Sequence, residues 1–265
     1  MKKTEKKAQI TIFVIIGIVL IVSVAIVFFT FRDKFMPQKE IPVDVRQEME
    51  RCVKDSANEA IKEISSHGGY SNDTVASKEN ILFEEIKIPV LCSTSGYNEL
   101  CTNNEPMLIQ ISEKEIKYLI TPKIENCFSE LETQLKKTYS YNAEQTFVDV
   151  KIYPSHLDLI VKKKITIQKL NQTENFEEFS QKINSGIYNF LILTNEIING
   201  ELECDCSIES CNADIINLNK NNHDFEITKP VFSNNNEEVY VIKEISSGNK
   251  FQFAVRNCVR SVPGT

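Results

Sequence analysis

Hydrophobic residues form one long continuous run near the start of the chain and shorter periodic segments after it. The run from Ile10 to Phe31 contains 22 residues and no charged side chain. As a helix it would be roughly 33 Å long, enough to cross a bilayer core of about 30 Å. A core helix of a soluble protein is rarely so long and uncharged, and a signal peptide has a shorter apolar region and small residues at its cleavage site. The pattern therefore predicts a retained transmembrane helix over residues 9–31, in contact with the lipid bilayer through residues 10–31.

Three later segments have apolar residues at helical spacing. The first covers residues 43–66 and stops at Gly68-Gly69, which adopt left-handed backbone conformations freely. The second begins at Ser112, which forms a capping-box pattern with Glu115, and runs to about residue 137, with Pro122 as a kink or boundary. The third fits residues 175–198. We expect three amphipathic helices.

Other segments have the character of strands. Residues 81–91 predict an edge strand, because Pro89 has no N–H to donate to a ladder. Residues 146–153 and 156–169 predict a hairpin around Pro154-Ser155, and residues 239–245 and 250–256 predict another. The Asn-rich stretches 217–222 and 234–236 predict loops. The predicted fold class is therefore α+β, with amphipathic helices packed on antiparallel strands across residues 43–265.

The distribution of charge predicts how the chain is oriented. Four lysines against one glutamate precede the apolar run, which makes residues 1–8 a basic leader on the cytoplasmic side. Residues 32–42 form a short stalk with two prolines. The first 36 residues hold six cations and two anions, so a total charge of −7 leaves −11 for the remainder. An acidic domain outside the membrane disfavours nucleic acid as a partner.

Eight cysteines in an extracytoplasmic domain predict disulfides. Cys92 and Cys101 flank a short polar loop and are expected to pair. Cys52 and Cys127 lie on the first two predicted helices of the domain, and their bond would lock these helices together. The other four would form two bridges in one of three ways, of which a bond within Cys-x-Cys is the least favoured because its ring is so small. These four are Cys204, Cys206, Cys211 and Cys258.

The same four cysteines offer an alternative, a zinc site with four thiolate ligands. The paired Cys-x-x-Cys knuckles of structural zinc sites are missing, however, and so is a Cys-x-x-Cys redox motif. The sequence therefore favours disulfides, with no metal and no cofactor.

No motif of a catalytic site is visible. The three histidines, His67, His156 and His223, have no metalloprotease spacing, and we interpret no Ser or Cys near them in sequence as a plausible nucleophile. The adjacent carboxylate pairs at 84–85, 177–178 and 237–238 are interpreted as solvated charges. We therefore expect a protein that is not an enzyme.

Two surface features complete the picture. Lys162-Lys163-Lys164 is interpreted as the protection of an edge strand against aggregation, with the docking of an acidic polymer as the alternative. Asn72 and Asn171 each begin an N-glycosylation sequon.

The segment Lys7-Ala8-Gln9-Ile10-Thr11-Ile12-Phe13 resembles the class III signal of archaeal type IV pilin-like proteins. The resemblance implies that a prepilin-type peptidase cuts between Ala8 and Gln9 and that the helix serves as an anchor or as an assembly stem. Pilins usually carry a glutamate at the fifth mature position, where this chain has Phe13. This departure favours anchoring over filament assembly.

A second resemblance covers most of the chain. Arg51-Cys52-Val53, the helix that follows and Gly68-Gly69-Tyr70 resemble an uncharacterised archaeal membrane-anchored surface protein family. The resemblance implies location and architecture. We expect a single-pass cell-surface protein with a pilin-like N-terminus and a structural or adhesive role, which associates with itself or with other surface proteins. The alternative is an anchored, receptor-like ligand-binding module that does not polymerise.

Overall fold

The computed structural model describes residues 18–23, 44–96, 99–169, 172–203, 212–230 and 237–257. The chain divides into two units, Met1–Asp44 and Val45–Thr265. In the first unit, residues 18–23 are helical. Within the described ranges, no helix combines the length and the apolar character needed to span a bilayer. Most of the predicted membrane segment, together with the leader, the stalk, Ala8 and Gln9, lies outside these ranges, so these assignments stay predictions.

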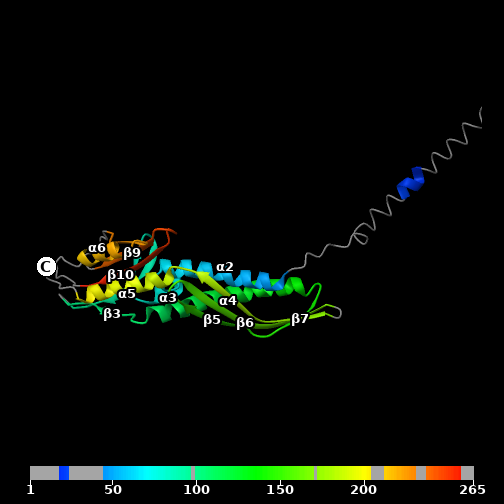
Figure 1. Cartoon of the computed structure of the whole chain (residues 1–265), viewed down its shortest axis with the longest axis horizontal. Helices are drawn as coiled ribbons and strands as arrows, with labels where there is room; N and C mark the ends of the chain where they lie inside the picture. Colours follow the sequence, from blue (N-terminus) through cyan, green and yellow to red (C-terminus); the bar gives the residue numbers. More distant parts are fainter. Residues whose placement is uncertain are drawn as a thin grey trace, which may run out of the picture. The chain divides into compact units, whose positions relative to one another are not determined.

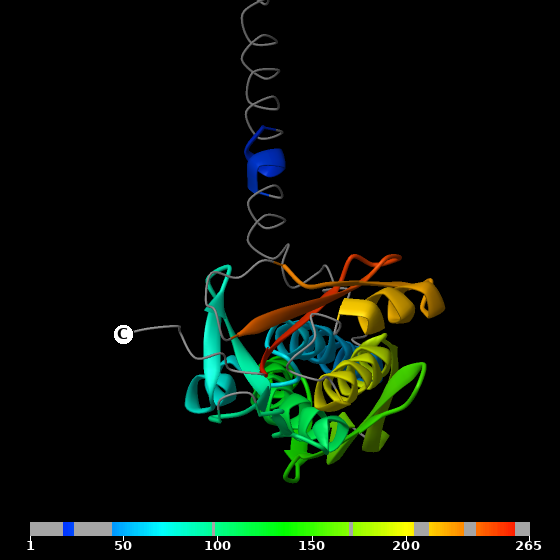
Figure 2. The same ribbon diagram turned by 90° about the vertical axis from the view of Figure 1, so that its left-hand side faces the viewer.

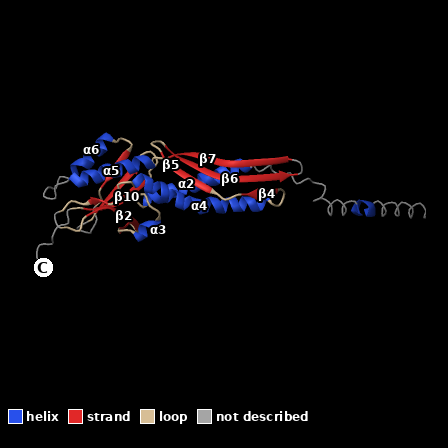
Figure 3. Ribbon diagram, turned by 90° about the horizontal axis from the view of Figure 1, so that it is seen from below, coloured by secondary structure: helices blue, strands red, loops and turns tan. Residues whose placement is uncertain are grey.

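In one part of the second unit, a layer of two long helices packs on an antiparallel sheet. Helices α2 (Val45–Ser66) and α4 (Leu108–Leu135) pack against each other and against strands β5 and β7. Figure 3 shows the strands running alongside these helices. The long strand β6 (His156–Lys169) is central, with β7 (Gln172–Asn184) along one side and β5 (Phe147–Ile152) followed by β4 (Ser140–Ala143) along the other. Alternate apolar residues of β5 and β6 are buried toward the helices, as in a sheet with one solvated face.

A second, mixed sheet has the strand order β1-β2-β10-β9-β8. Its strands β9 and β10 are labelled in Figure 1. Its strands are β1 (Asn80–Phe83), β2 (Ile86–Ser93), β8 (Phe225–Thr228), β9 (Glu238–Glu244) and β10 (Lys250–Arg256), and the short β3 (Thr102–Asn103) pairs with β2. Strands β2 and β10 run parallel, whereas the other pairs are antiparallel.

Helix α5 (Ile187–Glu203) packs on this sheet through an aromatic cluster. The ring of Phe190 lies 5.4 Å from that of Phe225 and 5.8 Å from that of Phe251, measured between ring centroids. Figure 2 shows α2, α4 and α5 in blue, green and yellow, with the orange and red strands β9 and β10 beside them. Two short helices, α3 (Asn72–Ser77) and α6 (Asn212–Asn221), complete the described part.

The predicted end of α2 at Gly68-Gly69 is confirmed, and the structure explains why both residues are glycine. Their φ angles are +59° and +96°. A Cβ on Gly68 would lie 2.6 Å from Cγ of Pro89 and 2.8 Å from the carbonyl oxygen of Gln252, and one on Gly69 would lie 2.7 Å from Oγ of Ser112. Left-handed backbone and close packing therefore both require glycine at this corner.

Both assigned disulfide pairs are confirmed. Cys52 of α2 is bonded to Cys127 of α4, with a Cα–Cα distance of 6.0 Å. Cys92 is bonded to Cys101, with a Cα–Cα distance of 5.4 Å. The other four cysteines lie outside the described residues. The α+β class, helix α2 and the two predicted hairpins are confirmed as well.

The predicted edge strand over residues 81–91 is wrong, because this segment forms the hairpin β1–β2. Its turn residues Glu84 and Glu85 both have positive φ, +47° and +69°. Turns of this kind usually contain Asn-Gly, so a Glu-Glu pair carries no signal for one. Strand β2 lies between β1 and β10, and Pro89 immediately precedes the residues that pair with β10.

The predicted helix over residues 175–198 is confirmed for residues 187–198, which lie in α5, but it is wrong for its first part, because residues 172–184 form β7. Between Lys162 and Ile165, β6 contains one more residue than the facing part of β7. This bulge places Phe176 opposite Ile165 and Phe179 opposite Val161, so that the two phenylalanines stack with ring centroids 6.2 Å apart. Two apolar residues three positions apart therefore lie on the same face of a strand, a spacing that in the sequence looks like that of a helix.

Two further assignments are corrected. Helix α4 begins at Leu108, so Ser112 and Glu115 lie inside it and form no capping box, and Pro122 does not end it. Instead, the Ser112 hydroxyl donates to the carbonyl of Gly69 (3.2 Å), and the Glu115 carboxylate accepts from the backbone N–H of Ser71 (3.0 Å). The Asn-rich residues 217–221 lie in α6 rather than in a loop, because Asn219 bonds both the N–H and the carbonyl of Ile227. The other predicted loop, 234–236, falls outside the described part.

The two disulfides are expected to differ in their contribution to stability. The pair 52–127 closes a loop with a sequence separation of 75 and the pair 92–101 one of 9. In the chain-entropy model these loops are worth about 4.5 and about 2.7 kcal/mol. Chemical denaturation of the full chain should therefore show a larger loss in Cys52→Ala/Cys127→Ala than in Cys92→Ala/Cys101→Ala. The reverse order would contradict the assignment of Cys52–Cys127 as the main constraint.

Candidate functional site

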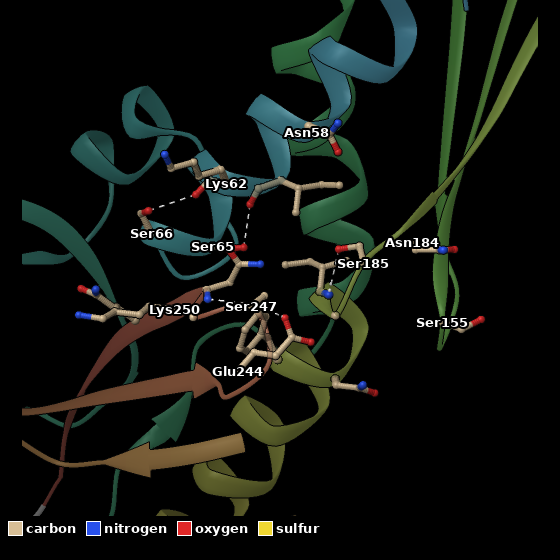
Figure 4. A pocket seen from close by; sticks show the side chains of 18 of the residues that line it. Asn58, Lys62, Ser65, Ser66, Ser155, Asn184, Ser185, Glu244, Ser247 and Lys250 are labelled. Carbon is tan, nitrogen blue, oxygen red and sulfur yellow. Dashed lines mark hydrogen bonds between the residues drawn. The ribbon is translucent and has the colours of Figure 1, made fainter. Parts of the chain in front are cut away.

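The second unit contains a cavity of about 920 Å³ lined by five separate segments, four of which form most of it. These four are the last turns of α2, the β5–β6 turn at Pro154-Ser155, the start of α5, and the β9–β10 turn with the first residues of β10 (Figure 4). Hairpin β1–β2 adds Glu84 and Ile86 to the lining. The cavity is the candidate functional site.

Helix α2 contributes one polar face to the cavity. Asn58, Ile61, Lys62 and Ser65 follow one another at helical spacing, and Ser66 lies next to them. The Ser65 hydroxyl donates to the carbonyl of Ile61 (2.7 Å) and that of Ser66 to the carbonyl of Lys62 (3.1 Å). These hydrogen bonds fix the two hydroxyls and leave their oxygens able to accept a hydrogen bond.

The start of α5 faces a carboxylate from the β9–β10 turn. Ser185 Oγ accepts from the backbone N–H of Ile187 (3.2 Å), so one free N–H of the first turn is satisfied. A Cβ on Gly186 would lie 2.7 Å from Oε1 of Glu244, so glycine allows this close approach. The Ser247 hydroxyl donates to the same carboxylate. Glu244 thus places negative charge at the positive end of the helix.

The amide side chains of the cavity are free to bind. None of Asn58, Asn184, Asn189 and Asn249 makes a side-chain hydrogen bond to another described residue, and all four are exposed. Gln252 of β10 is only 5% exposed, and its buried Oε1 has no hydrogen-bond partner. A buried acceptor without a partner costs free energy, which makes Gln252 an unusual residue in a cavity wall.

The charges that line the cavity balance. Lys62 and Lys250 oppose Glu84 and Glu244. The domain as a whole is strongly acidic, so this neutral lining differs from the rest of its surface.

A second polar cluster lies near the C-terminal end of α5 and is structural. The buried Glu201 carboxylate accepts from the Tyr240 hydroxyl and from Nδ2 of Asn257 (3.0 Å). Asn257 in turn accepts from the backbone N–H of Cys101 (2.8 Å). Burial, and next the Glu201 charge, raise the pKa of Tyr240. The cluster ties α5 and β9 to the disulfide loop.

The histidines and carboxylate pairs singled out in the sequence do not form this site. His67 Nδ1 lies 2.8 Å from the carbonyl of Glu63, His156 contacts Asp158 (3.2 Å), and His223 is exposed. Glu84 does line the cavity, and the interpretation of residues 237–238 as solvated charges is wrong for Glu237. The nearly buried side chain of Glu237 pairs with Arg256, and Glu238 pairs with Lys229.

The interpretation of the Lys162-Lys163-Lys164 run as the guard of an edge strand is wrong as well. Strand β6 has neighbours on both sides, and the run lies at its bulge. There the Lys163 ammonium donates to Thr146 Oγ1 (3.1 Å) and lies 5.9 Å from the ring centroid of Phe128. The position of these lysines is therefore explained by the bulge in β6 and not by an open sheet edge.

The other predicted sites are untested. Asn72 is exposed in the first turn of α3, and Asn171 lies outside the described ranges. Among the residues that the structure describes, no three His, Cys, Asp or Glu side chains gather where a metal ion could be held. Cys204, Cys206, Cys211 and Cys258, the ligands of the alternative zinc site, are not among those residues.

Comparison with known proteins returned no match to a protein-family model, to a curated protein or to a solved structure. The cavity itself has no sequence signal, because its residues come from five segments of the chain and no two of the segments form a motif.

Gln252→Leu tests whether the buried amide serves stability. Because Oε1 makes no hydrogen bond, we expect an unchanged free energy of unfolding or a gain of up to about 1 kcal/mol. The control Ser112→Ala removes a buried hydroxyl that is bonded to Gly69 and should lose about 1–2 kcal/mol. Chemical denaturation measures both. A loss above about 1 kcal/mol in Gln252→Leu would show that the amide is a structural residue.

Proposed function

We propose that the chain is a single-pass membrane protein whose domain lies outside the cytoplasm and binds a ligand in the cavity formed by α2, α5 and the β9–β10 turn. The cavity is the observation that carries the proposal. Its volume of about 920 Å³ falls in the range of small-molecule sites, and its free amides and the buried Gln252 are the few placed polar groups that such sites use. The proposed role is binding and not catalysis.

The location rests on the cysteines and on the N-terminal sequence. Disulfides persist in oxidising compartments, and two are formed in this domain. The apolar run from Ile10 to Phe31, with lysines before it, supplies the anchor and the orientation of the proposal. Both features favour a domain exposed on the outer side of the membrane.

A pilin-like structural or adhesive subunit is the second candidate. The sequence from Lys7 to Phe13 favours it, and a prepilin-type peptidase would then be a partner. Phe13, in place of the usual glutamate, weakens the case for filaments. The anchored binding module is therefore the preferred form of the proposal.

Protease treatment of intact cells tests the location. We expect trypsin to release peptides from residues 44–257 before lysis, with Cys52–Cys127 and Cys92–Cys101 as linked peptides under non-reducing conditions. A cytosolic protein of the same cells is the control and should stay intact. Peptides that appear after lysis alone, with reduced cysteines, would overturn the proposed location.

A further inference from the structure

We infer that the ligand of the cavity is a neutral saccharide of one or two sugar units, an inference that rests on the proposed function. The first argument is the match of hydrogen-bonding groups. A sugar hydroxyl both donates and accepts, and an amide side chain offers one group of each kind in a fixed plane. Four exposed asparagines without hydrogen-bond partners line this cavity, so its walls can pair with several hydroxyls at once.

The buried amide gives the second argument. Gln252 Oε1 lacks a partner, although 95% of the residue surface is buried. Oε1 has almost no accessible surface in the free domain, so a ligand hydroxyl pairs with it only once the Gln252 side chain turns toward the cavity, and this pairing would remove the cost of leaving the acceptor unpaired. An apolar ligand would leave that cost in place, so the site favours a ligand with a donor at this position.

Charge gives the third argument. The start of a helix attracts anions, but at α5 this position is taken by Glu244, which Gly186 admits to close range. Lys62 and Lys250 are matched in number by the two carboxylates of the lining. At the start of α5, where a helix would otherwise bind an anionic ligand most tightly, the Glu244 carboxylate would repel a phosphate or a carboxylate. A ligand without charge avoids this repulsion.

Size and apolar contact are consistent with a sugar. About 920 Å³ accommodates one or two sugar rings. Ile61, Ile86 and Pro154 lie among the polar groups, and each has exposed surface. They offer apolar area to the C–H faces of a ring, while the amides address its hydroxyls. This combination distinguishes a saccharide from a small ion.

Saturation-transfer NMR and calorimetry on the full chain, in a detergent without a sugar headgroup, test the inference. The first set of probes is glucose, galactose, mannose, N-acetylglucosamine and their common disaccharides. A second set contains phosphate, citrate, amino acids and dipeptides. We expect binding from the first set, weakened about tenfold in Asn184→Ala and in Asn189→Ala, each of which removes one amide. Asn142→Ala, an exposed asparagine of β4 outside the cavity, is the control and should leave the affinity unchanged.

The outcomes separate this inference from the proposed function. We expect Lys62→Ala/Lys250→Ala to change saccharide affinity less than about twofold, because a neutral ligand needs no cation. Binding from the second set alone, lost in the lysine variant or in Asn184→Ala, would overturn the saccharide and leave a binding module. Saccharide binding that survives both asparagine variants would overturn the assigned site. Binding of no probe from either set, with both disulfides intact, would overturn the inference and the binding role together.

Discussion

The described domain depends on the close packing at Gly68-Gly69, where α2 ends against three other elements. A Cβ added to Gly68 would lie within 3 Å of Pro89 in β2 and of the Gln252 carbonyl in β10, and one added to Gly69 would lie within 3 Å of Ser112 in α4. Each contact is short because no side chain intervenes, and the positive φ of both residues turns the chain sharply toward α3. The same corner fixes the last turns of α2 beside β10, and the cavity lies between these two elements. The geometry of the candidate site is thus a consequence of a packing constraint elsewhere in the fold.

The sequence predicted those elements that residue type and spacing specify locally. The periodicity of α2, the glycine pair after it, the two hairpins and the pairs Cys52–Cys127 and Cys92–Cys101 could all be assigned from residue types and spacing. Prediction failed where tertiary contacts override a local pattern. Phe176 and Phe179 suggest a helix, but the bulge opposite them in β6 lets a strand place both rings on one face. Glu84 and Glu85 adopt a turn that their residue types do not favour, and the pairing of β1 with β2, in which Phe83 lies opposite Ile86, holds them there.

The cavity could not be predicted for a different reason. Its residues are asparagines, serines and lysines, which are common on any surface, and their meaning comes from position alone. Asn58 and Asn249 are almost 200 positions apart in the sequence and line the same space. Gln252 looks in the sequence like a strand residue that points to solvent, because it alternates with Phe251 and Phe253. The structure buries both faces of β10 at this point, so that the polar residue of the alternation becomes part of a cavity wall.

The polar groups at the two ends of α5 show how structure and function use such groups differently. At the C-terminal end of α5, Glu201 accepts hydrogen bonds from Tyr240 and Asn257, so the cost of burying its carboxylate is offset and the cluster holds elements together. At the N-terminal end of the same helix, Glu244 is held by Ser247 and by the helix dipole, whereas the neighbouring amides have no partner. A polar group that is buried and satisfied stabilises the fold. One that is buried and unsatisfied, as Gln252 Oε1 is, costs free energy and contributes nothing to the fold in return, and this difference is why the cavity lined by Gln252, rather than the Glu201 cluster, is the candidate binding site.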